Sequence, residues 1–179
     1  KWFVKAGADS PENAFNYVDF DATPSYKNNL NKIGSKTWQP HQQDYVASDA
    51  SSYTWANGKG TEILGMVNYL HKQGANVMSF LTWNTSGDCG AVFPHVLKVT
   101  EQEYGNTSRA QQWNKVHKDR FDVSKLGQWE KVMEYADKKG IYLHFKTMET
   151  ENDNKMDGDT FGKQRKLYYR ELIARFAHH

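Results

Sequence analysis

Two glutamates, Glu149 and Glu151, follow an apolar stretch over residues 141–147 and are spaced like alternate residues of a strand. Glycosidases use two carboxylates, which lie about 5 Å apart in retaining enzymes and about 6.5–9.5 Å apart in inverting enzymes. Two residues of rise along a strand amount to about 6.6 Å. Both side chains would nevertheless approach a substrate from the same side, whereas the reaction needs carboxylates on opposite sides of the scissile bond. We therefore predict that Glu149 and Glu151 bind substrate or fix the loop, with a catalytic acid or base as the alternative.

The stretch before these glutamates alternates as a β-strand does. One face is apolar and suits packing against helices, and the other carries His144 and Lys146. Lys5, near the end of an earlier predicted strand, could meet them. Together they would form a polar, cationic floor that binds an acidic or hydroxyl-rich sugar. The alternative is structural: His144 would be an interior histidine with a hydrogen-bond partner, and Lys146 would pair with a neighbouring carboxylate.

Aromatic residues make up 14% of the chain, with six Trp and ten Tyr, and several lie in segments without regular periodicity. Exposed aromatic rings suit stacking against sugars and also suit protein interfaces. We expect a sugar to stack on Trp83, joined by Trp38 or Trp55, and we place Asn84 in the same substrate-binding set. The alternative is that these rings are apolar plugs that hold long loops against the core.

The sequence contains no clear motif for binding a metal ion or a cofactor. Asp9 and the oxygen-rich residues after it could bind a sugar in the first loop or a calcium ion, and residues 157–160 raise the same question. Neither segment has the spacing of an EF-hand, and capping of helices and turns is the alternative. The histidines are isolated, or adjacent as in His178 and His179, rather than spaced as zinc-ligand pairs. We therefore predict no cofactor and no metal site.

Helices and strands in alternation must position these residues. The clearest helix begins at Asp122, whose carboxylate can cap the first turn, and ends at Gly140. Its apolar residues recur at three- and four-residue spacing, and Glu134 stands four residues before Lys138, the order that favours an ion pair. A strand over residues 141–147 follows directly. The other predicted elements are a strand over 2–8, a helix from Thr61 to Gly74, a strand over 76–82 and a helix over 163–176.

The connections between these elements are unequal in length. Each helix is joined to the next strand by a short turn at a glycine, whereas long irregular segments over residues 9–60, 83–120 and 148–162 follow the strands. Right-handed βα crossovers place the carboxyl ends of the strands on one face, so we expect all three segments there. This is the layout of a (β/α)8 barrel, which needs about 250 residues.

We predict an α/β fold in which residues 1–179 form one domain, the N-terminal part of a TIM barrel. About three βα units are present, and the remainder would lie in the same polypeptide. A small open α/β sheet is the alternative.

Composition excludes several classes of protein. The net charge of +2 gives no electrostatic reason to expect nucleic-acid binding. No apolar run reaches the roughly 18 residues of a membrane span. A single cysteine, Cys89, cannot form an internal disulfide. The chain begins inside an apolar run, as a mature or trimmed chain would.

Three segments resemble a known group of proteins: KAGADSPEN at residues 5–13, residues 120–153, and KLYYRELIARFAHH at residues 166–179. They are similar to secreted, mostly bacterial, glycoside-hydrolase-like TIM-barrel proteins, which often carry a C-terminal domain described as collagen-binding. The resemblance implies a secreted, extracellular or periplasmic protein that acts on a carbohydrate polymer. It also implies that the catalytic pair follows the fourth and seventh strands, outside these residues. The alternative is a non-catalytic glycan-binding or extracellular structural protein on the same scaffold.

Overall fold

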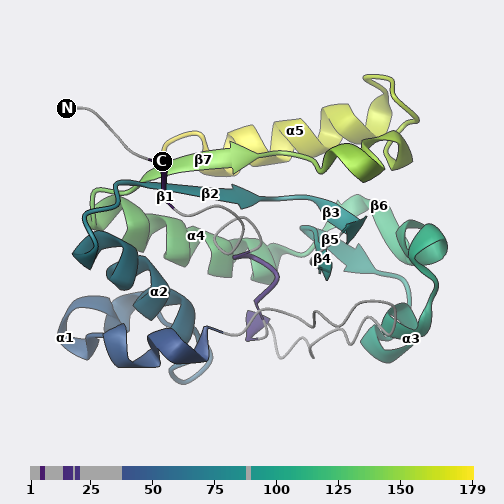
Figure 1. The fold of residues 1–179 in the computed structure, drawn as a ribbon. Coiled ribbons are helices and arrows are strands. Elements are labelled where there is room, and N and C mark those ends of the chain that lie inside the picture. The colour runs from purple at the N-terminus through teal and green to yellow at the C-terminus, as the bar shows by residue number, and fades with distance from the viewer. Residues whose placement is uncertain (1–4, 7–13, 18, 21–37, 88–89) are drawn as a thin grey trace.

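A parallel sheet and the helices along it form the centre of the fold. The computed structural model describes residues 5–6, 14–17, 19–20, 38–87 and 90–179 (Figure 1). Strands β1 (Lys5–Ala6), β2 (Val77–Leu81) and β7 (Tyr142–Lys146) form a three-stranded parallel sheet in the order β1-β2-β7. Val77 pairs with Tyr142 and Leu81 with Lys146. The fold is thus of the mixed α/β kind, and the predicted parallel arrangement of the three strands is confirmed.

Helix α4 (Val123–Lys138) has the ends that its sequence predicts. The Asp122 carboxylate accepts a hydrogen bond from the backbone N–H of Lys125 at 3.0 Å. Gly140 has a φ of +69°, a left-handed conformation that favours glycine. The predicted apolar stripe is buried, and Trp129 is fully inaccessible. Lys138, however, pairs with Asp49 rather than with Glu134.

The other two long helices also follow their predicted ranges. Helix α2 (Thr61–Lys72) is followed by Gly74 with a φ of +77°, and α5 spans Lys163–Phe176. The spacing on α5 predicts apolar contacts at Leu167, Leu172, Ile173 and Phe176. Ile173 is nevertheless 65% exposed, and Tyr168 is buried instead. The prediction for Ile173 is therefore wrong for the part of the chain that the structure describes.

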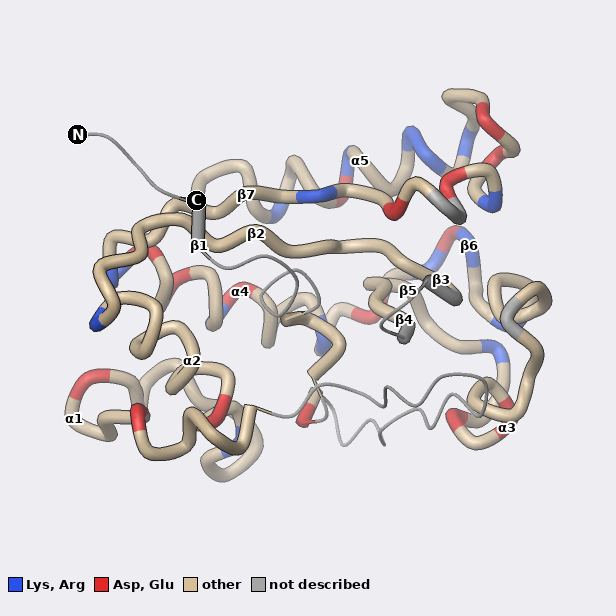
Figure 2. The backbone as a smooth tube through the Cα atoms, viewed as in Figure 1, with Lys and Arg blue, Asp and Glu red and all other residues tan. Residues whose placement is uncertain are grey.

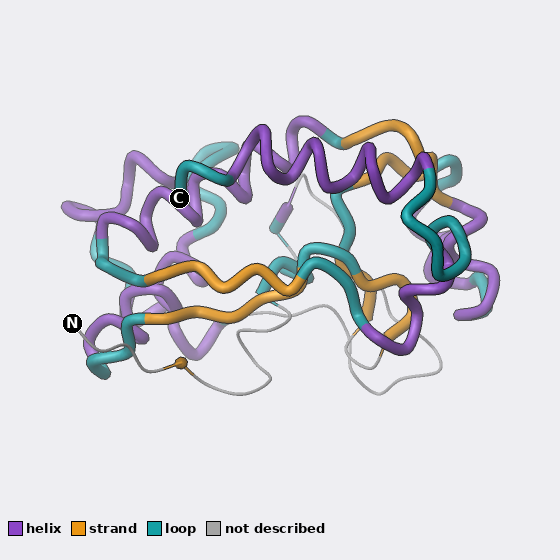
Figure 3. Tube along the Cα trace, turned by 90° about the horizontal axis from the view of Figure 1, so that it is seen from above, coloured by secondary structure: helices purple, strands orange, loops and turns teal. Residues whose placement is uncertain are grey.

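The face of the sheet that meets the helices is aromatic. The rings of Phe80 on β2 and Phe145 on β7 are 4.8 Å apart, and Phe145 also lies 6.3 Å from Phe176 on α5. Phe176 in turn lies 6.5 Å from Trp129 on α4. Figure 3 shows two long parallel strands running alongside the C-terminal helix. The alternation predicted for residues 141–147 is therefore confirmed on its apolar side.

The second irregular segment contains more structure than its sequence predicts. It forms two antiparallel pairs, β3 with β4 and β5 with β6, at the carboxyl ends of the central strands (Figure 1). These strands are too short to establish a period in the sequence. The elements are β3 (Asn84–Gly87), β4 (Gly90–Val92), β5 (His95–Leu97), α3 (Glu101–Asn106), the 3-10 helix Arg109–Lys115, and β6 (Val116–Phe121).

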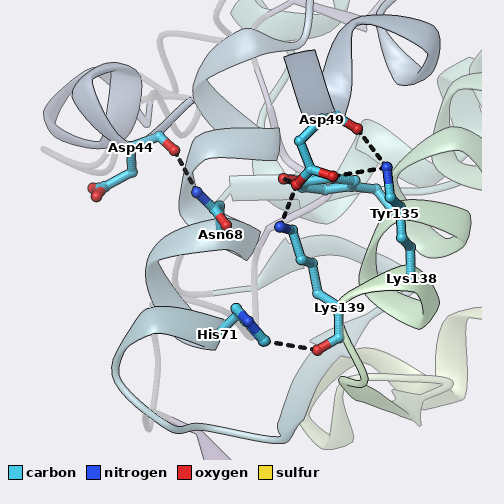
Figure 4. Close-up of polar contacts among 7 residues, drawn as sticks. All are labelled: Asp44, Asp49, Asn68, His71, Tyr135, Lys138 and Lys139. Atoms are coloured by element: carbon cyan, nitrogen blue, oxygen red, sulfur yellow. Dashed lines mark hydrogen bonds and ion pairs between the residues drawn. The ribbon is translucent and has the colours of Figure 1, made fainter. Parts of the chain in front are cut away.

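Residues 39–53 of the first irregular segment lie at the other end of the sheet. They contain the 3-10 helix Gln39–Asp44, α1 (Ala47–Ala50) and the 3-10 helix Ser51–Tyr53. Asp49 pairs with Lys138 and Lys139 at the end of α4 that leads into β7, and it accepts a hydrogen bond from the Tyr135 hydroxyl at 3.0 Å (Figure 4). This contact draws the segment to the amino ends of the strands. The expectation that all three long segments share one face is therefore wrong for residues 39–53.

Removing the Asp49 carboxylate should loosen this segment. Hydrogen bonds from Lys138, Lys139 and Tyr135 hold the pKa of the Asp49 carboxyl well below its usual range. A depressed carboxyl pKa stabilises the fold above the unfolded pKa, and the contribution is lost as the pH falls below about 4. Because Asp49 is partly exposed, we expect Asp49→Asn to lower the free energy of unfolding by only about 0.5–1 kcal/mol in low salt at neutral pH.

Urea unfolding of both proteins in low and high salt checks this expectation. The difference should shrink in high salt, because partly exposed ion pairs are screened. Glu134→Gln removes an exposed carboxylate from α4, the helix whose end Asp49 contacts, and is the matched control, with no expected change. An equal loss in the control variant would contradict the role of Asp49.

The described elements carry charges of both signs and include no helix of membrane-spanning character, as the composition indicates. Lys and Arg are intermixed with Asp and Glu along the chain (Figure 2). No described helix combines the length and apolar character needed to cross a membrane. The absence of a nucleic-acid partner stays a prediction.

Candidate functional site

The carboxyl ends of β2 and β7 bring two predicted site residues together. The Asn84 side-chain amide donates a hydrogen bond to Glu149 Oε2 at 3.1 Å. The backbone N–H of Glu149 donates to the Trp83 carbonyl at 3.3 Å. Asn84 is buried and Glu149 is half-buried. Because β2 and β7 are parallel neighbours, residues that follow them meet at one edge of the sheet.

A tyrosine on α5 fixes the same edge. The Tyr168 hydroxyl donates to the Thr147 carbonyl at 2.5 Å and lies 2.7 Å from the Thr82 hydroxyl. Tyr168 is fully buried, and burial raises the pKa of its phenol above its usual value. The neutral phenol thus ties the ends of both strands to the helix. The sequence does not predict this role, because Tyr168 lies between the apolar positions expected to form the helix stripe.

A second contact joins the loops after the two strands. The Lys155 ammonium group donates to the Thr85 carbonyl at 2.9 Å. Lys155 ends the 3-10 helix Thr150–Lys155, which directly follows Glu149. The loop that carries Glu149 is therefore attached to β3 as well as to β7. This attachment limits the positions that the carboxylate can adopt.

The polar face of β7 lies where the alternation places it. His144 is exposed and Lys146 is half-buried, and both point away from the Phe80–Phe145 contact. His144 Nδ1 lies 2.6 Å from the Ser79 hydroxyl, its register partner on β2. The alternative of an interior histidine does not hold in the described structure, although the expected hydrogen-bond partner exists. Substrate contact by His144 and Lys146 stays a prediction.

The three tryptophans proposed to stack on sugars are core residues. Trp83 is 0%, Trp38 6% and Trp55 8% exposed. The indole of Trp83 packs edge-on against Trp113, with ring centroids 5.2 Å apart. A sugar cannot stack on a ring whose faces are already covered. The prediction for these tryptophans is therefore wrong, and they act as the apolar plugs of the alternative interpretation.

The remaining predicted contacts have different outcomes. Asp9 and the side chains of Lys5 and Glu151 lie outside the described part of the structure. The backbone of Glu151 belongs to the 3-10 helix Thr150–Lys155. The strand spacing expected between Glu149 and Glu151 therefore does not apply, because the chain turns immediately after Glu149.

The oxygen-rich segment over residues 157–160 caps a helix. The Asp157 carboxylate accepts a hydrogen bond from the backbone N–H of Arg165, in the first turn of α5, at 2.8 Å. The Thr160 hydroxyl donates to the Asp157 carbonyl at 2.8 Å. These contacts confirm the capping interpretation for this segment.

A buried histidine also adjoins the edge. His95 on β5 is 1% exposed, and its ring lies 6.0 Å from that of Tyr168. Neither ring nitrogen has a hydrogen-bond partner. Burial, assisted by the nearby Lys125 charge, lowers the pKa of His95 to about 3. His95 is thus neutral at physiological pH and belongs to the packing beneath the site.

Comparison of the chain with models of protein families, with curated proteins and with solved structures found no match. The fold defines a mixed α/β protein with a polar edge at the carboxyl ends of parallel strands.

Proposed function

We propose that this protein is glycoside-hydrolase-like and that residues at the carboxyl ends of β2 and β7 bind a carbohydrate polymer. The observation that carries the proposal is the Asn84–Glu149 pair, a carboxylate and an amide held together at that edge. In (β/α)8 barrels the residues that follow the strands form the active site. Carboxylates and amides are also suitable partners for sugar hydroxyls, because together they can accept and donate hydrogen bonds.

Two features of the described sheet support a larger barrel. Within the described residues, β7 pairs with β2 and has no strand on its other edge. An apolar pocket of about 280 Å³ lies between β7 and α5. Its lining residues include Phe145, Leu172 and Ile173. An open apolar edge favours association with other chains unless it is covered. Further βα units of the same polypeptide would cover it and would explain the exposure of Ile173.

In this proposal the described residues position the sugar and do not break the bond. Glu149 would accept hydrogen bonds from hydroxyls, and His144 and Lys146 would line the inner face of the barrel. The catalytic acid and nucleophile would follow later strands, as the resemblance implies. Oriented binding of this kind contributes to the rate by holding the scissile bond in place. A secreted location also rests on the resemblance.

The test is binding and hydrolysis of acidic and neutral polysaccharides by the full-length protein. Affinity electrophoresis should show that Glu149→Ala weakens polysaccharide binding about 10- to 100-fold, the effect of losing a hydrogen bond to a charged group. Glu134→Gln, on the outer surface of α4, is the control and should bind as the unaltered protein does.

Three outcomes separate the alternatives. Hydrolysis that declines in Glu149→Ala together with binding supports the proposal. Binding without hydrolysis of any polysaccharide would indicate a glycan-binding or structural protein on this scaffold. Unchanged binding by Glu149→Ala, or no binding to any polysaccharide, would contradict the role of this edge.

A further inference from the structure

A second cluster of chemically active side chains lies at the opposite end of the sheet. Glu130 on α4 meets His178 and His179, which follow α5. Glu130 Oε1 lies 3.1 Å from His178 Nε2 and 3.2 Å from His179 Nε2. One ligand atom from each of the three residues lies within 4.8 Å of the others. A single cation could therefore contact all three after small side-chain movements.

His179 is prepared for this role by its other contacts. Its side chain is only 2% exposed, and its Nδ1 lies 2.6 Å from the Asp137 carboxylate. Its Nε2 is buried, and the 3.2 Å contact of this nitrogen with Glu130 Oε1 does not have the geometry of a hydrogen bond. A carboxylate on one ring nitrogen fixes the tautomer of a histidine and directs the other nitrogen toward a metal. Asp137 and Glu130 are two turns apart on α4, so both face the same side of the helix.

The cluster adjoins open space. A pocket of about 540 Å³ at the amino ends of β2 and β7 is lined by residues that include His71, Asp137 and His179. The His71 Nδ1 is already held by the Lys139 carbonyl at 2.9 Å, and Lys139 pairs with Asp49 (Figure 4). The His178 side chain is 61% exposed, so water could reach the cluster from the side formed by His178. A bound cation could complete its coordination with such water.

We propose that Glu130, His178 and His179 bind a divalent transition-metal ion, with zinc as the best match, and that Asp137 positions His179. Two imidazoles and one carboxylate form a zinc ligand set that leaves a position for water. The site lies away from the Asn84–Glu149 edge, so its role is to join the end of α5 to α4. The sequence does not reveal this site, because adjacent histidines lack the spacing of a zinc-ligand pair and the third ligand, Glu130, comes from a different helix.

Metal titration of the chelator-treated protein tests this proposal. In competition with a chromophoric chelator, zinc should bind at one equivalent with a Kd of about 1 μM or tighter, or about −8 kcal/mol. His179→Ala and Glu130→Gln should each weaken zinc binding by about 100-fold or more. Asp137→Asn should weaken it about 10- to 100-fold, as the loss of an outer hydrogen bond to a ligand does. His117→Ala, on β6, is the control and should not change it.

The proposal also has a readout in the unaltered protein, in case a variant fails to fold. Zinc should shift the ring resonances of His178 and His179 in NMR spectra and leave those of His117 in place. It should also raise the melting temperature of the unaltered protein but not that of His179→Ala. Zinc binding weaker than about 1 mM, or equal binding by His179→Ala, would overturn the proposal. So would shifts confined to His117.

Discussion

Replacing Trp83 with alanine is expected to lower the free energy of unfolding by about 3–5 kcal/mol, the usual cost of truncating a buried aromatic residue. The Trp83 side chain is fully inaccessible and packs against Trp113 with ring centroids 5.2 Å apart. Its loss would leave a cavity beside Trp113, at the residue whose carbonyl accepts a hydrogen bond from the Glu149 N–H. Equilibrium unfolding in urea, followed by circular dichroism, measures the effect.

A surface aromatic residue provides the comparison. Phe161 is 61% exposed, and Phe161→Ala should change the free energy of unfolding by about 1 kcal/mol or less. If Trp83→Ala were as stable as Phe161→Ala yet lost polysaccharide binding, Trp83 would be a stacking platform after all. A loss of stability at least three times that of the control would establish it as a core residue.

The repeating βα elements could be predicted because their determinants are local. Asp122 caps α4 through a contact only three residues away, and Gly140 ends the helix through its own backbone conformation. The apolar stripe between them depends on periodicity alone. The parallel order of β1, β2 and β7 then follows from the helices that connect them.

The irregular segments could not be predicted, because distant contacts decide their structure. Asp49 is drawn to the amino end of the sheet by lysines 89 and 90 residues later in the chain, which no local pattern reveals. The sequence around Trp83 does not distinguish a buried ring from an exposed aromatic ring in a loop. Its burial depends on β3 and the 3-10 helix Arg109–Lys115, which approach it only in the folded chain.

The candidate site shows the same division. Asn84 and Glu149 could be named because each follows a predicted strand, and parallel neighbours bring such residues together. The geometry of Glu151 could not be predicted, because the chain leaves the extended conformation after Glu149. The role of Tyr168 could not be predicted either, because its hydroxyl forms hydrogen bonds with Thr82 and Thr147 across the helix–sheet interface.

Acidification should destabilise the protein through His95 before the carboxylates titrate. His95 has a folded-state pKa of about 3, well below that of an unfolded histidine, near 6.5. The unfolded chain therefore binds the proton first, and stability falls as the pH decreases below about 6.5. Between about pH 7 and pH 4.5 this single group should remove roughly 2–3 kcal/mol of unfolding free energy. Urea unfolding across this pH range measures the loss.

The variant His95→Leu isolates that contribution. Neither ring nitrogen of His95 has a hydrogen-bond partner, so a leucine of similar size leaves no polar group unpaired. At neutral pH we expect its stability to lie within about 1.5 kcal/mol of that of the unaltered protein, as for other volume-conserving core replacements. At pH 4.5 the variant should be the more stable of the two. Asp49 cannot produce this crossover, because its contribution is lost only below about pH 4. A His95 ring that titrates near 6.5 in NMR spectra would contradict the prediction, since it would require a ring in contact with water.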